Sequence, residues 1–467
     1  MEQILLLNPP GDKLYQRDMY CSGVSKANYY WPSIDLLVLS GILGQRYDVT
    51  ILDAIVEGLT PEETRRRIEQ GEYHAIVFLT GVASWKQDFA FMAGIRKTSH
   101  PGLIIGNGDV LLYDAERFLR EYGFLDAILF DYTSPDILAF LGGEYDGISA
   151  MAFRRGGDIL LRKNDIRPVE FAFPVPQHEK FPLKKYLLAH GRRSPFTTAM
   201  TNFGCPFNCS FCPASVLGFK YRAVENIMEE LRHITSLGIK EIFFTDFTFE
   251  SRRENTLELC RRIVEEKLDL SWVCSSRANT LDEELLSWMK KAGCHTLLLG
   301  VENGDEELLQ RYSKGVTKDQ LGRAFALCQK FRIRTLGHFI IGLPGETEET
   351  VRKTIDFAKE LDCDIASFNI AVPALGTPLR EAALKNGWLQ EDVLEFDASD
   401  SYPTLETPEF SRRQAWEWRN RAVREFYFRP SYIWKMAAST RSLNQWKILV
   451  LNGWAVLKGS LAKGKSG

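Results

Sequence analysis

Short apolar runs alternate with helix-length amphipathic segments along most of the chain, and this alternation limits the possible folds more than any other feature. The first part of the chain has predicted strands at 4–7, 48–52, 75–79, 103–105 and 127–130. Helical patterns lie between them, most clearly over 61–69 and 85–97. Strands separated by helices form parallel, doubly wound sheets, whose ligands lie beyond the carboxyl ends of the strands.

The same rhythm resumes near residue 197 and continues to about 372. Predicted strands lie at 197–201, 241–245, 271–274, 296–301, 334–341 and 367–372, each followed by a helix-length pattern. The stretch 141–195 between the two regions looks like a connector. It contains a predicted hairpin at 151–160 and a proline-rich segment at 168–182, and we expect no chemistry in it.

Composition excludes several classes of function. The chain has 467 residues, enough for two or three domains, and its net charge of −3 gives no indication of nucleic-acid binding. Of its 9 cysteines, those outside one short loop show no paired spacing, which favours a reducing cytoplasm. The amino-terminal segment reads as a strand rather than a signal peptide, and no apolar stretch is long enough to predict a membrane-spanning helix.

The loop that carries three cysteines has the clearest chemical pattern. Cys205, Cys209 and Cys212 follow the spacing C-x3-C-x2-C on a segment interrupted by Gly204 and Pro206. Three thiolates on a tight loop suit an iron–sulfur cluster and leave one iron open to a small molecule. The alternatives are a zinc site or three unrelated thiols. Zinc usually takes four ligands, and no histidine or fourth cysteine lies near this loop.

This spacing, with Phe211 directly before the last cysteine, resembles the signature of the radical S-adenosylmethionine (SAM) superfamily. The resemblance implies a [4Fe-4S] cluster that binds SAM at its open iron and an electron that cleaves SAM to a 5′-deoxyadenosyl radical. It also implies a partial (β/α)6 barrel of the TIM type at 196–380. The partners it implies are a small hydrophobic substrate and a reducing electron donor such as flavodoxin or ferredoxin.

Further positions at successive strand ends resemble motifs of the same superfamily. The resemblance implies that Asp246 receives the SAM amino group and that Arg277 pairs with the SAM carboxylate. Glu302 would accept hydrogen bonds from the SAM ribose or amino group. Gly342 and Gly345 belong to a turn expected to pass beneath the adenine.

Two more positions complete the predicted cofactor site. Pro373 opens a Pro-x-x-Gly-Thr-Pro-Leu turn found in relatives, and Phe211 lies beside the cluster ligands. His338 replaces a glycine of the superfamily pattern, and a role in proton transfer to the substrate is one hypothesis for it. His233 and His295 are expected to be surface or capping groups.

The first domain resembles the cobalamin-binding domain of the cobalamin-dependent radical SAM enzymes, a group that includes anaerobic tetrapyrrole cyclases, hopanoid-modifying enzymes and antibiotic methylases. Two turns depart from these relatives: 106–109 reads Gly-Asn-Gly-Asp instead of Gly-Gly-Pro-His, and 130–133 reads Phe-Asp-Tyr-Thr instead of Gly-Glu-Gly-Glu. No Asp-x-His-x-x-Gly motif offers a cobalt ligand. Cobalamin binding therefore stays open, since a shared fold does not fix the ligand.

Two aromatic regions leave alternatives open. The loop 11–31 either covers a cofactor or flat substrate or fills a domain interface. The carboxyl-terminal part, rich in tryptophan and basic residues, has three interpretations. It closes the open side of the barrel and lines an apolar pocket, it contacts a membrane surface peripherally through 446–465, or it packs on the protein's own core with a basic tail.

The predicted fold class is therefore α/β: a doubly wound parallel sheet at 1–140, a connector at 141–195, the partial barrel at 196–380 and a helical part at 381–467. The predicted function is a radical SAM enzyme that removes hydrogen from an unactivated carbon of a large hydrophobic substrate, such as a tetrapyrrole or bacteriochlorophyll-type pigment or an isoprenoid lipid. Methylation, hydroxylation or another oxidation, and ring rearrangement are the candidate outcomes. A cluster-based redox or oxygen sensor without catalysis is the alternative.

Overall fold

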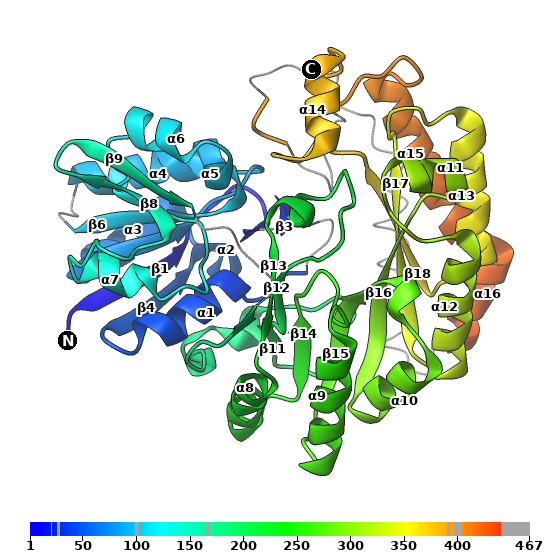
Figure 1. Ribbon diagram of the computed structural model, residues 1–467, viewed down its shortest axis with the longest axis horizontal. Helices are drawn as coiled ribbons and strands as arrows, with labels where there is room; N and C mark the ends of the chain where they lie inside the picture. The colour runs from blue at the N-terminus through cyan, green and yellow to red at the C-terminus, as the bar shows by residue number, and fades with distance from the viewer. Residues whose placement is uncertain are drawn as a thin grey trace.

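The computed structural model describes residues 1–19, 21–25, 29–98, 102–163, 169–389, 393–396 and 404–439. Two α/β units stand side by side, the first in blue and cyan and the second in green and yellow (Figure 1). This arrangement confirms the predicted fold class, a parallel sheet followed by a partial barrel and carboxyl-terminal helices.

The first sheet has the strand order β4-β1-β5-β6-β7-β8-β9. Its parallel strands are β4 (Asp48–Asp53), β1 (Gln3–Asn8), β5 (Tyr73–Leu79), β6 (Leu103–Asn107) and β7 (Ala127–Leu129). The antiparallel hairpin of β8 (Ala150–Arg155) and β9 (Asp158–Lys163) pairs with β7. This hairpin, which the sequence analysis assigned to the connector, therefore continues the first sheet. The chain order reverses beside β1, and ligands of such sheets bind at this point, beyond the carboxyl ends.

The helices of the first unit are α1 (Ile34–Leu43), α2 (Ala54–Glu57), α3 (Pro61–Glu69), α4 (Trp85–Thr98), α5 (Asp109–Tyr113), α6 (Ala115–Glu121) and α7 (Asp136–Leu141). Helix α3 begins where the sequence predicts it, because Thr60 and Glu63 form a capping box and Pro61 occupies the first turn. Helix α1 is different. Every one of its residues is buried, including the polar residues Asp35 and Ser40, as expected for a predominantly apolar helix inside the protein.

The second sheet consists of six parallel strands in chain order, as predicted. They are β11 (Phe196–Ala199), β14 (Glu241–Phe244), β15 (Ser271–Ser276), β16 (Cys294–Glu302), β17 (Arg334–Ile341) and β18 (Ile365–Ile370). Helices α8 (Val224–Ser236), α9 (Arg253–Glu265), α10 (Glu283–Lys291), α12 (Lys318–Lys330) and α13 (Glu348–Glu360) cover its outer face (Figure 1). A short helix, α11 (Glu306–Arg311), precedes α12. The cluster loop follows β11 and the short strand β12 (Asn202–Gly204).

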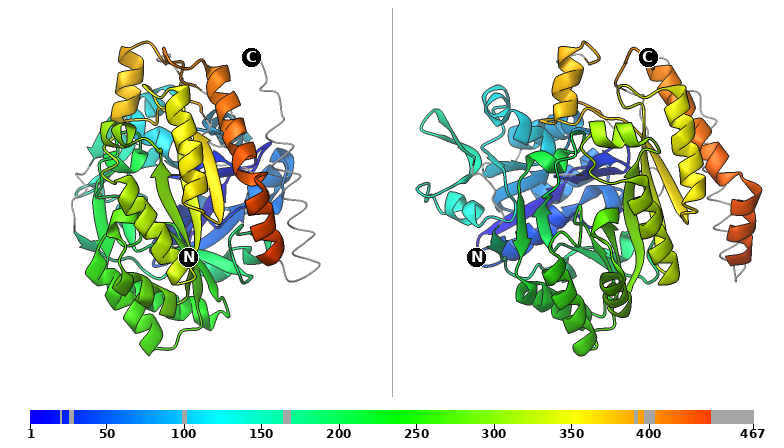
Figure 2. Two further views of the ribbon diagram at one scale, coloured as in Figure 1. Left: turned by 90° about the vertical axis from the view of Figure 1, so that its right-hand side faces the viewer. Right: turned by 45° about the vertical axis from the view of Figure 1, so that its right-hand side comes forward.

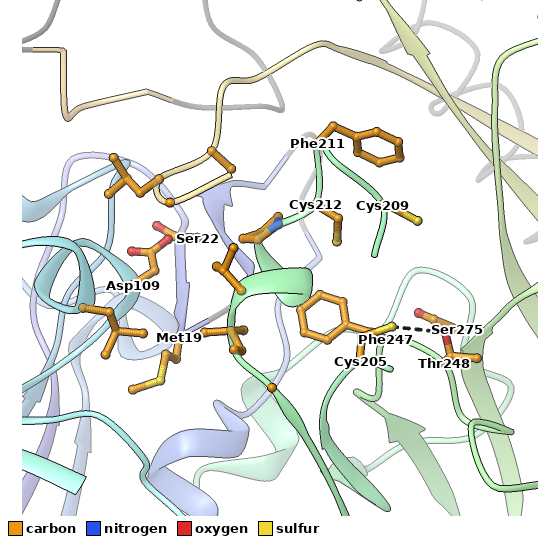
Figure 3. Close-up of a pocket in the computed structure, with 18 of the residues that line it drawn as sticks. Met19, Ser22, Asp109, Cys205, Cys209, Phe211, Cys212, Phe247, Thr248 and Ser275 are labelled. Atoms are coloured by element: carbon orange, nitrogen blue, oxygen red, sulfur yellow. Dashed lines mark hydrogen bonds between the residues drawn. The ribbon is translucent and has the colours of Figure 1, made fainter. Parts of the chain in front are cut away.

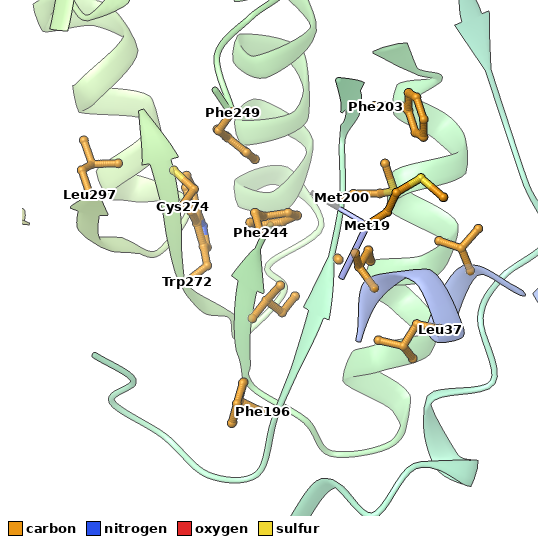
Figure 4. Packing of buried hydrophobic residues seen from close by; sticks show 14 of the residues in the cluster. Met19, Leu37, Phe196, Met200, Phe203, Phe244, Phe249, Trp272, Cys274 and Leu297 are labelled. Atoms are coloured by element: carbon orange, nitrogen blue, oxygen red, sulfur yellow. The ribbon is translucent and has the colours of Figure 1, made fainter. Parts of the chain in front are cut away.

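A small sheet of β10 (Glu170–Phe171), β13 (Phe219–Arg222) and β12 stands between the two units. Apolar side chains continue across this boundary without a break. Met19 and Leu37 of the first unit lie beside Met200 and Phe203 of the second, within one buried cluster (Figure 4). The two units therefore share a hydrophobic core, which fixes the cavity between them.

The aromatic loop of the first unit contains the hairpin of β2 (Tyr15–Asp18) and β3 (Cys21–Val24). Trp31 packs edge-on against Phe243 at 5.3 Å between ring centroids, which supports the interpretation that the loop fills the domain interface. Met19 and Ser22 line the cavity between the units. That the loop covers a cofactor or flat substrate stays a prediction.

The carboxyl-terminal helices are α14 (Pro378–Lys385), α15 (Arg412–Tyr427) and α16 (Pro430–Ser439). Helix α15 packs beside the edge strand β18 (Figure 2). The Tyr427 hydroxyl donates to the Ala366 carbonyl at 2.7 Å, and the Arg419 Nε donates to the Phe368 carbonyl at 3.2 Å. The helix thus covers the open side of the barrel, as one interpretation expected, but it does not line the cavity.

The membrane interpretation concerned 446–465, which lie outside the described residues. Within the part of the chain that the structure describes, no helix is long and apolar enough to cross a membrane.

Candidate active site

A large cavity of about 1280 Å³ lies between the two units. Its walls come from the carboxyl ends of both sheets, so residues distant in sequence face one another across it. Met19, Ser22 and Asp109 lie on the side of the first unit, and the three cysteines lie on the side of the barrel (Figure 3). Cavities that hold drug-sized ligands measure about 300–1,000 Å³. This cavity therefore has room for more than one small molecule.

The structure brings the three predicted cluster ligands together on one wall of this cavity. Cys205, Cys209 and Cys212 all line it. The loop turns sharply at Gly204, where φ is 71° and a Cβ atom would lie 1.9 Å from the Gly218 carbonyl oxygen. Only glycine fits there. The Cys205 amide donates to the same carbonyl at 3.2 Å and the Cys212 amide donates to the Cys209 carbonyl at 3.0 Å, which fixes the loop.

The donor set fits an iron–sulfur cluster better than a single metal ion. Within the described ranges, no three histidine, cysteine or carboxylate ligands converge as a single ion requires. A four-iron cluster needs its thiolates further apart, because each cysteine binds a different iron. Burial raises the pKa of Cys205 and raises that of Cys212 to about 12. These thiols must lose protons when they bind iron, so cluster binding is coupled to proton release.

Two buried cations flank the cysteines. The Arg277 Nη1 lies 3.5 Å from the Cys209 Sγ, and Lys314 forms an ion pair with Glu302 at 2.7 Å. Sequence reasoning predicted Arg277 and Glu302 but missed Lys314. In the sequence, the only signal for this lysine is that a glycine, Gly315, follows it. In the structure, Gly315 has a positive φ of 63°, which marks a tight turn.

Glu302 faces the cavity because the end of β16 is irregular. The pairing register between β16 and β17 shifts between Gly300 and Glu302, and Glu302 itself adopts a left-handed φ of 67°. A bulge of this kind re-aims the side chain that follows it, and such strained residues concentrate at functional sites. Gly300 makes room for the ion pair, since a Cβ atom there would lie 2.4 Å from the Glu302 Oε1 and 2.6 Å from the Lys314 Nζ.

Asp246 lies behind the cavity wall rather than among the residues that line it. One carboxylate oxygen, Oδ1, accepts the amides of Thr201 at 2.8 Å and Asn202 at 2.5 Å. The other oxygen, Oδ2, is buried without a hydrogen-bond partner. Burial raises the pKa of Asp246 to about 7. The carboxyl group therefore holds the chain between β11 and β12, and its second oxygen is left for another donor.

The predicted turn at Gly342 and Gly345 reaches the cavity through Leu343, while the two glycines themselves do not line it. Glu346 joins the ends of two strands: its carboxylate accepts the Asn303 side-chain amide at 2.7 Å and the Gly342 backbone amide at 2.6 Å. Burial raises the pKa of Glu346 to about 7. Gly345 has a φ of 86°, and a Cβ atom there would lie 1.9 Å from an Arg311 nitrogen.

The remaining predicted residues divide into two groups. Phe211 and His338 line the cavity, Phe211 packing edge-on against Tyr312. Pro373 does not line it, although both of its neighbours do. The expectation that His295 is a surface or capping group is wrong. Its ring is buried, and its Nε2 lies 2.8 Å from the Glu241 carboxylate. The strand pattern alone did not indicate this inward-facing polar pair.

The wall of the first unit contains two polar features, and both belong to the turns 106–109 and 130–133 that the sequence analysis singled out. Asp109 lies at the cavity, where its Oδ1 accepts the Val82 amide at 2.9 Å and burial raises its pKa to about 7. Asp131 and Thr133 both accept hydrogen bonds from Lys220 of the small sheet, at 2.6 Å for the threonine. The departing turn 130–133 is thus tied directly to the second unit.

Connector residues also take part in this wall, although we expected none of them to matter. Ser149, Lys163 and Phe171 all line the cavity. They arrive there because the hairpin of β8 and β9 joins the first sheet and β10 joins the small sheet.

Comparisons with known proteins identify the family. The model of the radical SAM superfamily matches residues 201–358, which include the cluster loop and most of the barrel. An uncharacterized methyltransferase of Pyrococcus horikoshii is 33% identical over 93% of this chain and 94% of its own. This chain belongs to the radical SAM superfamily. The [4Fe-4S] cluster and SAM are therefore cofactors of this radical SAM enzyme, and its turnover needs a substrate and a reductant.

More distant relatives of this radical SAM enzyme include the anaerobic magnesium-protoporphyrin IX monomethyl ester cyclase of Rubrivivax gelatinosus, 24% identical over 77% of this chain and 68% of its own. Among solved structures, the radical SAM methyltransferase TsrM of Kitasatospora setae, with cobalamin and a [4Fe-4S] cluster bound, covers 98% of this chain and 99% of its own, with a TM-score of 0.69 and 16% identity. The cobalamin-dependent enzyme OxsB, with aqua-cobalamin and SAM bound, covers 98% and 72%, with a TM-score of 0.68 and 16% identity. These two likenesses show that the fold is shared.

Proposed function

We propose that this radical SAM enzyme is a cobalamin-dependent methyltransferase that acts on a large hydrophobic substrate. One observation carries the proposal. A continuous cavity of about 1280 Å³ joins the carboxyl edge of the first sheet to the three cysteines of the barrel. A corrin above the first sheet and SAM at the cluster would then face each other across the space left for the substrate.

The first sheet supports a cobalamin site by its topology. Its strand order reverses beside β1, and the cavity opens at the carboxyl ends of the same sheet. The part of the wall contributed by 1–140 contains no described histidine, so the proposal includes no protein ligand to cobalt from this wall. TsrM and the relative from Pyrococcus horikoshii are described as methyltransferases, which supports methyl transfer. The structures of TsrM and OxsB contain cobalamin, which supports a cobalamin site.

The residues divide the work within this site. When bound, the cluster supplies the electron that cleaves SAM, and cobalamin supplies a carrier for a methyl group. Cys205, Cys209 and Cys212 hold the cluster. The Lys314–Glu302 pair presents a fixed carboxylate for the SAM ribose or amino group. Asp246 lies behind the cavity wall, where its role is to hold the chain between β11 and β12. The other predicted residues shape the cofactor site. The turn at Gly342 and Gly345 supports the adenine, and Phe211 and Pro373 complete the cofactor surroundings.

The substrate class follows from the side chains that face the cavity. Most are apolar, and Phe130, Phe211, Phe247 and Phe396 supply aromatic surface. Such a wall favours a flat or greasy molecule, with a tetrapyrrole pigment or an isoprenoid lipid as the leading candidates. We also propose a reducing cytoplasm and a donor such as flavodoxin or ferredoxin, since the cluster must be reduced before each cleavage.

The domains have separate roles in this proposal. We propose 1–140 together with the hairpin of β8 and β9 as the cobalamin-binding unit, and the rest of 141–195 as the connector. We propose 196–380 as the unit that binds SAM and the cluster, and 381–467 as the part that closes the barrel. A sensor without catalysis has no use for the cofactor positions described above, so we do not propose it.

The test uses SAM that carries an isotopic label in its methyl group. Full-length protein reconstituted anaerobically with iron, sulfide and cobalamin is incubated with SAM, a reductant and extracted pigments or lipids. We expect label in an extracted molecule only when cobalamin is present, and no label with the Cys209→Ala variant. Production of 5′-deoxyadenosine with no label in any product, with or without cobalamin, would favour oxidation or ring rearrangement instead.

A further inference from the structure

Arg277 is a buried cation whose counter-charge is missing. Its side chain is 6% exposed, and within the described ranges no carboxylate lies within ion-pair distance of it. The neighbouring cation Lys314, by contrast, is paired with Glu302 at 2.7 Å. A buried charge is costly unless it is paired or fully hydrogen-bonded. Arg277 therefore indicates that a negative group belongs beside it.

The orientation of the guanidinium shows which group that is. Its Nη1 lies 3.5 Å from the Cys209 Sγ. Its central carbon lies 4.1 Å from the centroid of the Phe207 ring, so the planar group is stacked on a residue of the cluster loop itself. Both contacts direct the positive charge at the loop that holds the three cysteines.

The rest of the side chain is held firmly in this position. The Arg277 Nε donates to the Asn279 Oδ1 at 2.8 Å. The Arg277 backbone amide donates to the Glu250 carboxylate at 2.8 Å, and the same carboxylate accepts the Ser276 and Thr280 hydroxyls. Together these contacts hold the guanidinium in its orientation toward Cys209.

We propose that Arg277 is a positioning residue for the cluster rather than the partner of the SAM carboxylate: its guanidinium donates a hydrogen bond to the Cys209 thiolate and raises the reduction potential of the cluster. Reduction adds one electron to a cluster whose thiolates are already negative. A nearby positive donor stabilises the more negative, reduced state, and hydrogen bonds to the sulfurs are among the factors that set the potential. The proposal rests on the cluster at the three cysteines and does not depend on methyl transfer.

Three substitutions separate the components of this effect. Arg277→Met removes the charge and the donor, Arg277→Gln keeps an N–H donor without the charge, and Arg277→Lys keeps the charge without the planar group. Arg252→Met is the matched control. Arg252 is also stacked on an aromatic ring, 3.8 Å from the Tyr221 centroid, but it does not line the cavity and contacts none of the three cysteines.

The experiment uses the full-length protein after anaerobic reconstitution with iron and sulfide, with no substrate present. Iron content, the cluster's reduction potential by redox titration with electron paramagnetic resonance, and the dissociation constant of SAM are measured for each variant. For Arg277→Met we expect normal iron content, an unchanged SAM dissociation constant and a one-electron reduction equilibrium at least tenfold less favourable, which is a fall of 59 mV. The reduction potential should fall less in Arg277→Gln and Arg277→Lys, and it should not change in Arg252→Met.

Two results would overturn the proposal. An unchanged potential with SAM binding weakened tenfold or more would assign Arg277 to the SAM carboxylate, and an unchanged potential with unchanged SAM binding would leave it no role at the cluster. If Arg277→Met does not retain the cluster, Arg277→Lys and Phe207→Leu decide. A lowered potential in both supports the hydrogen bond to Cys209, and an unchanged potential in both refutes it.

Discussion

At the scale of single residues, buried acids hold the site together, and Asp246 is the clearest case. It anchors two backbone amides through one oxygen, while the other oxygen has no partner. Burial raises its pKa from 3.8 to about 7. Between these values the folded protein keeps a proton that the unfolded chain has lost. The stability contributed by this group is therefore full below pH 3.8 and is lost as the pH rises to about 7.

Asp246→Asn should remove this pH dependence while keeping the Oδ1 acceptor. Between about pH 5 and 7, titration of Asp246 should lower the unfolding free energy of the native protein by up to about 1.4 kcal/mol per pH unit. The Asp246→Asn variant should lack this contribution. Urea denaturation of the two apoproteins at several pH values measures the difference. Parallel pH profiles would show that Asp246 titrates normally. SAM binding by the same variant tests whether the Oδ2 receives the amino group.

Gly300 gives a second test at this scale, because it has no room for a methyl group. The Cβ atom of Gly300→Ala would lie 2.4 Å from the Glu302 Oε1 and 2.6 Å from the Lys314 Nζ. We expect the ion pair to shift and the affinity for SAM to fall at least tenfold, which is about 1.4 kcal/mol. Gly322→Ala is the control, since nothing lies within 4 Å of a Cβ atom in the middle of α12. Equal SAM affinities in the two variants would remove the Lys314–Glu302 pair from the proposed SAM site.

Sequence reasoning identified single residues where a motif names them and missed those that act through packing. The cysteines, Arg277 and Glu302 stand at strand ends in a recognisable order, and the structure places all of them on the cavity. Lys314 belongs to no such motif, because its role arises when a turn brings it back to β16. His295 was misjudged since a polar residue beside a strand start gives no sign of its buried partner.

At the scale of elements, the small sheet links the two units through Lys220. This lysine of β13 is buried and contacts Asp131 and Thr133, which follow β7 of the first sheet. Its ammonium group also lies 4.7 Å from the Phe171 ring centroid and 4.8 Å from that of Phe203.

Lys220→Met should destabilise the protein by about 3–5 kcal/mol, because it leaves the Asp131 carboxylate buried and unpaired. The double variant Lys220→Met/Asp131→Asn should recover part of the loss. The exposed pair of Lys240 and Asp269 supplies the control, since Lys240→Met should cost at most about 1 kcal/mol. Denaturation midpoints of the four proteins provide the comparison. Similar midpoints for Lys220→Met and Lys240→Met would mean that the bridge between the units contributes little.

Elements that face both units were the hardest to predict. Helix α1 is buried on every side because the first sheet and the barrel both pack on it, and its two polar residues, Asp35 and Ser40, are buried as well. It therefore has no exposed polar face that an amphipathic period would show. The segment 393–396 also contacts more than one part of the molecule. The Phe396 amide donates to the Val82 carbonyl at 3.2 Å, which connects this segment to the first unit. The Arg380 Nη2 of α14 donates to the Val393 carbonyl at 2.8 Å, which holds the same segment to the end of the barrel.

At the scale of the whole molecule, the alternation of strands and helices was enough to predict both sheets, since period and length are local properties. The way the two sheets meet depends on side chains far apart in sequence, such as Met19 with Phe203 in their shared core. The cavity exists because that core holds the carboxyl ends of the two sheets toward each other. Because the cavity is continuous, we propose that two cofactors act on one substrate.

The most direct test of that claim is the corrin-to-iron ratio after anaerobic purification and reconstitution with cobalamin, read from the visible spectrum and metal analysis. We expect one bound corrin for each [4Fe-4S] cluster. Cys209→Ala is the control for independent sites, and it should lose iron but keep the corrin. A protein with a full complement of iron and no bound corrin would contradict the proposed cobalamin-dependent methyl transfer.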